Sequence, residues 1–463
     1  MPSPIPDLAT HQRRATTRRT GAGPSSIADR RVMAVLTALL VSVTVLQRLA
    51  LPLGGVLLAV SVVVALAGIG YLLYHGDVVE NSAATRVFVV AMAVCFLAAG
   101  IVLLRSGVGA VTSLVYLPAI WVVFCFRLHP ARQHLYGRVA DRFEKLMVLF
   151  AVVGVLQTVG QAVGAWTYVD VVLRVVPGEL LFTGYNTSYP IQYGSPIIKA
   201  NGFVFVEPSI YAQFLALAIL STLVRRSGWV RTVLLAVALV CTISGTGLLF
   251  LAFGVAVLAV RRGGRWTARI VAAAAVIGAV ALMTPFGQII ASRTDETSET
   301  NSSGSLRFVQ PYERIVEGWS TDPWSLLLGQ GAGSADDLAD RIFAATGLPI
   351  NFSGLAKLLM EYGLLATLLF GVFVWLAVVR RSPSPTLSLS SVFASAVLTG
   401  ALLQPQVLYV MLPLCSLFLG HHHEAELDAS RRRSPRGGAA VAAERAGGAR
   451  ITVPPASPNG NLS

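Results

Sequence analysis

Long runs of apolar residues recur along this chain, separated by mostly short polar connections. Many runs approach roughly 20 residues, the length that a helix needs to cross a bilayer core of about 30 Å. Because backbone polar groups in lipid need internal partners, each run is expected to be helical. The pattern predicts an all-α polytopic membrane protein with about twelve transmembrane helices. The expected spans are residues 32–50, 53–74, 87–104, 109–126, 146–165, 208–224, 229–244, 246–260, 267–285, 353–379, 387–403 and 405–420.

The polar segments divide the chain further. Residues 1–31 and 421–463 are rich in Arg, Ala, Ser, Gly and Pro, which predicts disordered tails around a membrane domain at 32–420. Two connections, about 166–207 and 286–352, are far longer than the roughly 12–15 residues beyond which a loop is usually functional or disordered. Both carry aromatic residues and charges of both signs, so we expect folded caps.

Charge sets the expected orientation. Hydrophobic residues make up 54% of the 463 residues and charged residues 13%, which excludes an ordinary soluble protein. The net charge is +13, but most of the 36 lysines and arginines lie in the tails and in alternate short loops. Basic residues keep loops on the cytoplasmic side, so this distribution indicates membrane orientation and no nucleic-acid partner. Both termini are expected in the cytoplasm, with the two long loops outside.

The first segment with candidate chemistry runs from Lys199 through Asn201 to Glu207, directly before an apolar span. Pro208 and Ser209 are typical of a helix start. Glu207 would then lie at the positive end of a helix, where it serves either as a capping carboxylate or as a general base.

The second segment is Arg307-Phe-Val-Gln-Pro-Tyr-Glu-Arg314 in the longer outer loop. If it is helical, residues seven apart project to one face, so Arg307 and Arg314 would lie together. Two guanidiniums near the membrane suit a diphosphate, which arginine binds through paired hydrogen bonds. The alternative is that both pair internally with Glu313 and Glu317.

The third segment begins at Asn351 and continues into a span that contains Lys357 and Glu361. Charged residues inside a span are costly and usually functional. These two are four apart, so a structural ion pair is the simpler interpretation. A glycine-rich stretch, Gly329 to Gly333, is interpreted as a turn, because no strand precedes it as in a nucleotide-binding loop.

All seven histidines fall on the expected cytoplasmic side. Chemistry on the outer face therefore has no histidine base. No carboxylate cluster has the spacing of a cation site, so we expect neither a metal nor another cofactor.

In this order and with this topology, the three segments resemble the O-antigen polymerase and ligase superfamily of bacterial membrane proteins. The resemblance covers about residues 85–420. It rests on the Lys199-Ala-Asn-Gly box with Glu207-Pro-Ser, the Ser244-Gly-Thr-Gly break, Arg307 with the later glycines, and Asn351 before Glu361-Tyr-Gly.

The resemblance implies glycan transfer from an undecaprenyl-diphosphate donor on the outer face of the bacterial cytoplasmic membrane. It implies that Lys199, Arg307 and Arg314 hold the diphosphate, with Glu207 and Arg307 catalytic. Asn201, Tyr312 and Asn351 would contact the glycan. Chain-length regulators and flippases are the partners that it implies, besides the bilayer. Glu313 and Asp336 are substitutes for Glu207 as the base.

Two positions depart from the family pattern. Family members usually have arginine where this chain has Lys199, so the charge is kept and the guanidinium geometry is lost. Ligases that transfer O-antigen to a lipid A core carry a catalytic histidine near the residue before Asn351, where this chain has Ile350. The departure favours a polymerase, or a transferase to another acceptor.

Two other functions remain open. A transporter or flippase would carry polar groups in mid-membrane, often on broken and repeated helices. A non-catalytic assembly partner would not bring Lys199, Arg307 and Arg314 together at one cavity.

The predicted orientation is testable by cysteine labelling in intact cells. Cysteines introduced at positions 180 and 300 should react with an impermeant thiol reagent, whereas cysteines at 135 and 263 should react only after permeabilisation. Labelling of position 135 from outside would contradict the orientation.

Overall fold

The computed structural model describes residues 26–53, 56–107, 109–182, 184–192, 194–263, 304–400 and 403–420. The expected span at 267–285, the histidines at 421–423 and most of both tails lie outside these ranges. The described residues all belong to one compact unit.

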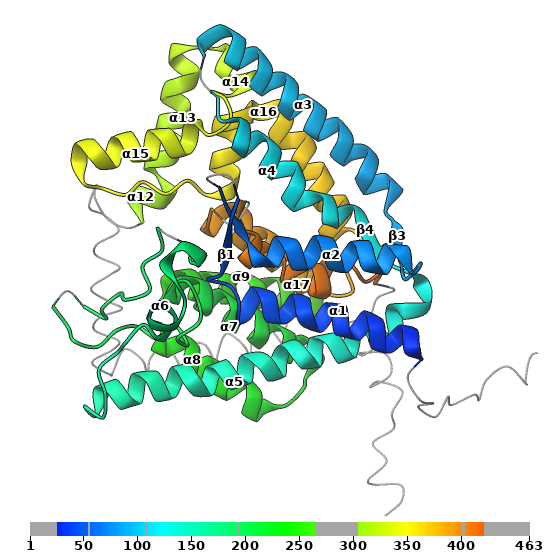
Figure 1. The fold of residues 1–463 in the computed structure, drawn as a ribbon, viewed down its shortest axis with the longest axis vertical. Helices are drawn as coiled ribbons and strands as arrows, with labels where there is room; N and C mark the ends of the chain where they lie inside the picture. Colours follow the sequence, from blue (N-terminus) through cyan, green and yellow to red (C-terminus); the bar gives the residue numbers. More distant parts are fainter. Residues whose placement is uncertain are drawn as a thin grey trace, which may run out of the picture. The chain divides into compact units, whose positions relative to one another are not determined.

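The described part is mostly helical (Figure 1). Its longer helices are α1 (Ile27–Thr44), α2 (Val60–Tyr74), α3 (Ser82–Ser106), α4 (Val111–Trp121), α5 (Tyr136–Ala162), α7 (Pro208–Arg225), α8 (Trp229–Cys241), α9 (Gly245–Arg262), α13 (Gln310–Thr321), α15 (Ser334–Thr346), α16 (Gly354–Val374) and α17 (Pro385–Phe393). The shorter ones are α6 (Val171–Val175), α12 (Ser305–Phe308), α14 (Trp324–Leu328) and α18 (Pro405–Leu408).

In the part of the chain that the structure describes, five helical segments are long and apolar enough to cross a membrane: Ser82–Ser106, Pro130–Ala162, Pro208–Arg225, Gly245–Arg262 and Gly354–Val379. Other apolar helices, such as α2 and α8, have 10–17 residues. A helix coincides with each expected span in the described ranges, although several are shorter than expected. The predicted break near Gly245 is confirmed, because α8 ends at Cys241 and α9 begins at Gly245.

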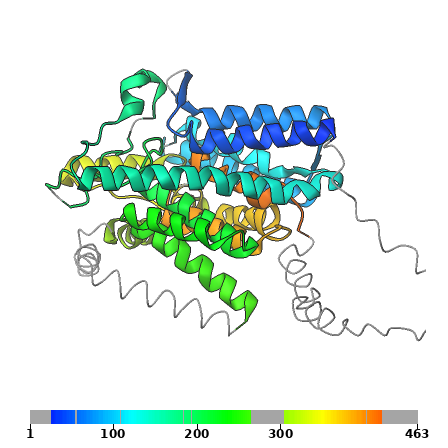
Figure 2. The ribbon, with the colours of Figure 1, turned by 90° about the horizontal axis from the view of Figure 1, so that it is seen from below.

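Two short antiparallel ribbons were not expected from the apolar runs. β1 (Ala50–Leu53) pairs with β2 (Val56–Ala59), with Ala50 opposite Ala59. β3 (Val78–Glu80) pairs with β4 (Phe126–Leu128). The first ribbon shortens the span expected at 53–74, and α1 and α2 on either side of it lie side by side (Figure 2).

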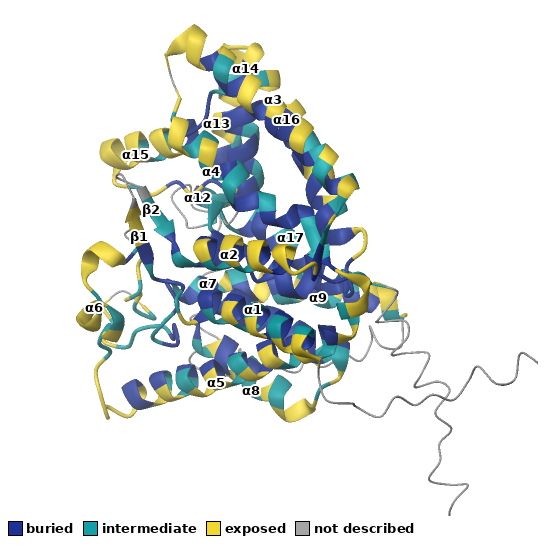
Figure 3. Cartoon of the chain, turned by 45° about the vertical axis from the view of Figure 1, so that its right-hand side comes forward, coloured by how far each residue is buried: buried dark blue, intermediate teal, exposed yellow. Residues whose placement is uncertain are grey.

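Helix α7 is the most deeply buried of the long apolar helices, whereas α6 and α15 are largely exposed (Figure 3). Polar contacts fix α7 at its C-terminal end. Glu144 of α5 is fully buried and accepts hydrogen bonds from Ser221, Arg225 and Ser227 at 2.6–2.8 Å. Buried charge is tolerated only when it is paired and hydrogen-bonded, as Glu144 is.

Helix α16 is interrupted at Gly363, which has φ +76° and ψ −176°. The interruption frees carbonyl groups in the preceding turn, and the glycine-rich turn after α14 supplies their donors. Gln330 donates its backbone N–H to Met360 O at 2.7 Å, and Gly331 donates to Glu361 O at 3.1 Å. The interpretation of this stretch as a turn is confirmed, and its N–H groups bind helix carbonyls.

Replacing Gly363 by alanine should destabilise the protein. A Cβ atom there would collide with the Leu327 carbonyl, and this backbone conformation is almost restricted to glycine. The backbone strain alone is about 1–3 kcal/mol. Gly363→Ala should therefore lower the thermal unfolding midpoint in detergent.

Gly371→Ala is the matched control, because it lies in the same helix and its Cβ would meet nothing within 4 Å. Its midpoint should be no lower than that of the wild type. Equal midpoints for the two variants would show that the interruption at Gly363 is unimportant for stability.

Candidate functional site

A cavity of about 730 Å³ lies where the two long connections meet the ends of several helices. We call it the central cavity. Its walls come from α4, the segment before α7, α12, α15, the start of α16 and the segment before α18. Its charged and polar lining includes Tyr116, Tyr185, Glu207, Ser209, Arg307, Asp336, Asp340, Asn351, Ser353, Lys357 and Gln404.

Glu207 enters the cavity from the residue that precedes α7. Pro208 occupies the first turn, as the sequence predicts, but the Glu207 side chain makes no capping bond to the helix. Its Oε2 instead accepts a hydrogen bond from Ser209 Oγ at 2.8 Å. Removal from water raises the pKa of this half-buried carboxyl, and Ser209 and the charge of Arg307 offset only part of the increase. A raised pKa is typical of a carboxylate that acts as a general base near neutral pH.

Two glutamines of α5 hold the segment that leads to Glu207. Gln157 Oε1 accepts from the backbone N–H groups of Asn201 and Gly202 at 3.2 and 3.1 Å. Gln161 Oε1 accepts from the N–H of Ile198 at 2.9 Å. The Asn201 side chain is fully buried and donates to the Tyr168 hydroxyl and to Thr187 O. These contacts support the backbone of the Lys-Ala-Asn-Gly box, and neither Lys199 nor Asn201 lines the central cavity.

The first long loop is also fixed to the end of α1. Arg48 forms two parallel hydrogen bonds with Asp170, at 2.6 and 2.8 Å, and both side chains are largely buried. Thr187 Oγ1 donates to the same carboxylate at 2.8 Å. Paired guanidinium–carboxylate contacts are strongly directional, so they hold the loop that carries Tyr185 over the cavity.

Arg307 lines the cavity from α12 and interacts electrostatically with Glu207. Within the described ranges, the Arg307 side chain forms no ion pair, and its influence on Glu207 is electrostatic only. The predicted continuous helix from Arg307 to Arg314 does not form, because α12 ends at Phe308 and α13 begins at Gln310. Pro311 explains the break, since a helical proline would clash with the carbonyl four residues earlier, that of Arg307.

Arg314 consequently lies elsewhere. It lines a second cavity and pairs with Glu317 at 2.8 Å, as the internal alternative predicted.

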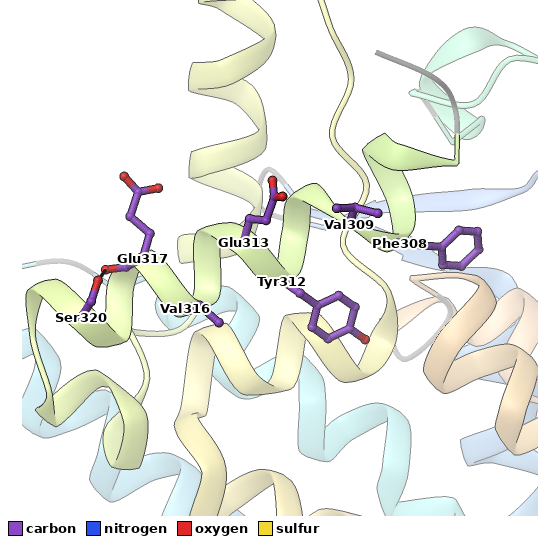
Figure 4. A pocket seen from close by; sticks show the side chains of 7 residues that line it. All are labelled: Phe308, Val309, Tyr312, Glu313, Val316, Glu317 and Ser320. Atoms are coloured by element: carbon purple, nitrogen blue, oxygen red, sulfur yellow. Dashed lines mark hydrogen bonds between the residues drawn. The ribbon is translucent and has the colours of Figure 1, made fainter. Parts of the chain in front are cut away.

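Tyr312 lines a shallow groove along α12 and α13, where its ring points away from Glu313 and Glu317 (Figure 4). Its hydroxyl lies 3.3 Å from the Oγ of Ser353, which lines the central cavity, whereas Tyr312 itself does not line it.

Lys357 lies between two carboxylates. Its Nζ is 2.5 Å from Asp336 Oδ2 and 3.6 Å from Glu361 Oε1. The predicted pairing with Glu361 is therefore present, but the shorter contact is with Asp336 from α15. The Glu361 carboxylate is fully buried and accepts no hydrogen bond from the described residues.

The structure thus brings together Glu207, Arg307 and Asn351 of the predicted site residues. It adds Lys357 as a second cation, which the sequence suggested only through its place inside a span. Tyr185 was not predicted at all. Its hydroxyl accepts a hydrogen bond from Gln406 at 2.9 Å, and burial raises its pKa. Its only sequence signal was an aromatic residue in a long outer loop.

No group of three or more His, Cys, Asp or Glu side chains in the described ranges is arranged to hold a metal ion. No protein-family model matches the chain, and no curated protein is significantly similar to it. The functional assignment therefore depends on the residues of this chain and on their geometry.

The raised pKa of Glu207 predicts a pH-dependent stability difference. A carboxyl with a raised folded-state pKa destabilises the folded state above the ordinary carboxyl pKa of about 4.3 and costs nothing below it. Glu207→Gln removes the charge and keeps the shape, so it should raise the unfolding midpoint at pH 8. The gain should vanish towards pH 4.

Glu313→Gln is the control, since Glu313 is exposed. Its midpoint should follow the wild type at every pH. A Glu207→Gln midpoint that lies below the wild type at pH 8 would mean that the Glu207 charge is stabilising.

Proposed function

We propose that this chain is a membrane glycosyltransferase that polymerises or transfers undecaprenyl-diphosphate-linked oligosaccharides. The supporting observation is the central cavity, in which an arginine without an ion-pair partner among the described residues faces a carboxylate with a raised pKa. The arginine, Arg307, can stabilise a negative charge that develops on a leaving group, and the carboxylate, Glu207, can accept the proton of an acceptor hydroxyl. Glu207 is positioned by the start of the apolar helix α7 and Arg307 by the short helix α12.

The reaction needs two residues in defined roles. Glu207 accepts the proton of an acceptor hydroxyl while that oxygen attacks the anomeric carbon of the donor sugar. The bond between this carbon and the diphosphate oxygen breaks, and its electron pair leaves on undecaprenyl diphosphate. Arg307 stabilises the charge that develops on the leaving group. The new glycosidic bond and the protonated Glu207 complete the balance.

Lys357 is the second cation in this proposal, because it lines the same cavity and Lys199 and Arg314 do not. Lys199, Arg307 and Arg314 do not line one common cavity. This separation is the result expected for a non-catalytic assembly partner. Convergence of Arg307, Lys357 and Glu207 supports the enzyme instead. Asn351 remains the proposed glycan contact, at the rim of the cavity.

Position 350 bears on the choice of acceptor. Ile350 lines the central cavity, where a histidine would be able to act as a base. An isoleucine supplies no proton acceptor, which favours a polymerase over a ligase of the lipid A core type. The proposal includes about twelve spans with both termini in the cytoplasm and the cavity on the outer face.

A transporter is the second candidate, and one observation favours it. α16 is interrupted at Gly363, next to the buried Lys357–Glu361 pair, and interrupted helices with polar groups are typical of transport sites. The two functions differ in their products. An enzyme forms a longer glycan from purified lipid-linked units, whereas a transporter only moves them across a membrane.

The test is transfer by the purified protein with a lipid-linked repeat unit as both donor and acceptor. Arg307→Ala should lower the rate by about 10²–10³-fold, the usual effect of losing one well-placed electrostatic donor. Arg307→Lys should recover little, because an ammonium cannot reproduce the guanidinium fork.

Arg174→Ala is the control, since Arg174 is exposed on α6 and lies outside the cavity lining. It should transfer at the wild-type rate. A near-normal rate for Arg307→Ala would remove Arg307 from the site, and no glycan growth with wild-type protein would favour the transporter.

A further inference from the structure

Arg314 belongs to a second cavity that the proposed reaction does not use. This cavity has a volume of about 720 Å³ and lies on the other side of α15 from the central cavity. Asp336 and Asp340 line the central cavity, whereas Leu338 and Arg341 line the second one. We call it the arginine cavity.

Three arginines from three helices meet there. Arg105 comes from the last turn of α3, Arg314 from α13 and Arg341 from α15. Figure 1 shows α13 and α14 beside the end of α3. Among the described residues that line the cavity, only Glu317 and Asp322 are carboxylates, so the described part of its wall carries an excess of positive charge.

The internal ion pairs are weak competitors for a ligand. Arg314 contacts Glu317 at 2.8 Å, but both side chains are about half-exposed. Arg105 and Asp322 are 3.7 Å apart and equally exposed. Exposed pairs of this kind contribute little to stability. Arg341 donates only to the Asp337 carbonyl and has no carboxylate partner among the described residues.

A further polar group in this cavity lacks a partner. Ser334 lines the cavity and is only 5% exposed, yet its hydroxyl makes no hydrogen bond with a described residue. A buried hydroxyl without a partner is uncommon and indicates a group that a ligand or water satisfies.

The surroundings indicate a ligand at the membrane surface. α3 is the most apolar of the spanning candidates, and Leu104, next to Arg105, is 90% exposed. Trp324 of α14 is 59% exposed, and tryptophan is enriched at the level of lipid headgroups. The cavity therefore lies at the end of the most apolar candidate span, beside exposed leucine and tryptophan side chains.

We propose that the arginine cavity binds the headgroup of an anionic phospholipid. The guanidiniums would hold the phosphate through paired hydrogen bonds, and a small shift of the buried Ser334 side chain would let its hydroxyl donate to a headgroup oxygen. A single phosphodiester charge matches three guanidiniums opposed by two carboxylates. This inference does not depend on the proposed glycosyltransferase activity.

Native mass spectrometry of the full chain in neutral detergent tests the proposal. Dioleoyl phosphatidylglycerol should remain bound under conditions that remove the zwitterionic dioleoyl phosphatidylethanolamine. Arg341→Gln should weaken phosphatidylglycerol binding by about threefold to tenfold, the effect of losing one charge-assisted hydrogen bond at a partly exposed site. Arg174→Gln, outside the cavity, should leave binding unchanged.

A second variant keeps the test independent of folding defects. Glu317→Gln frees Arg314 from its carboxylate, so it should strengthen phosphatidylglycerol binding. Equal retention of the two phospholipids would overturn the proposal, as would unchanged binding in Arg341→Gln. Undecaprenyl diphosphate serves as a competitor: its displacement of phosphatidylglycerol at equal concentration would assign the cavity to that diphosphate instead.

Discussion

The interruption of α16 at Gly363 is the constraint on which the candidate site depends. In an apolar helical domain, a broken helix leaves carbonyl groups that need donors, because lipid supplies none. The N–H groups of Gln330 and Gly331 meet that need at Met360 and Glu361. The contact docks the second long connection on α16. Asn351 adds to it, since its backbone N–H donates to Leu306 O beside Arg307. The first contact holds the turn before α15 on α16, and the second holds α12 beside the start of α16, so that Asp336 and Arg307 both line the central cavity.

The charges of this cavity are compensated unequally, which the proposed transfer reaction would exploit. Lys357 is shared by Asp336 and Glu361, so its charge is compensated inside the apolar domain. Arg307 has no such partner among the described residues, and Glu207 is partly removed from water beside it. Structures usually avoid such groups unless they serve a function, since catalytic sites need shifted pKa values and preorganised charge. The supports around them are rigid: Gln157 and Gln161 hold the segment before Glu207, and Arg48 holds the loop above it.

Much of the helical framework could be predicted from the sequence, and the assembly of the site only in part. Apolar runs locate helices because burial in lipid depends on local composition, and Pro208 and the glycines near Gly245 mark real boundaries. The first ribbon escaped prediction because β1 and β2 are as apolar as the helices beside them, and the second because β3 and β4 have only three residues each. Pro311 ends the helical continuity that a shared Arg307–Arg314 face requires. The approach of Asp336 to Lys357 depends on how the second long connection folds, which no local pattern encodes. Arg314 was expected to bind the diphosphate and Asn201 the glycan, because of their side-chain chemistry. Packing places both outside the central cavity.

The central claim is that Arg307 holds a lipid diphosphate opposite Glu207. Equilibrium binding of undecaprenyl diphosphate, the leaving group itself, tests it without requiring turnover. The purified chain should bind this diphosphate more tightly than undecaprenyl monophosphate, and Arg307→Ala should abolish the preference while Arg341→Gln retains it. Equal affinity for the two lipids in the wild type, or an unchanged preference in Arg307→Ala, would contradict the account.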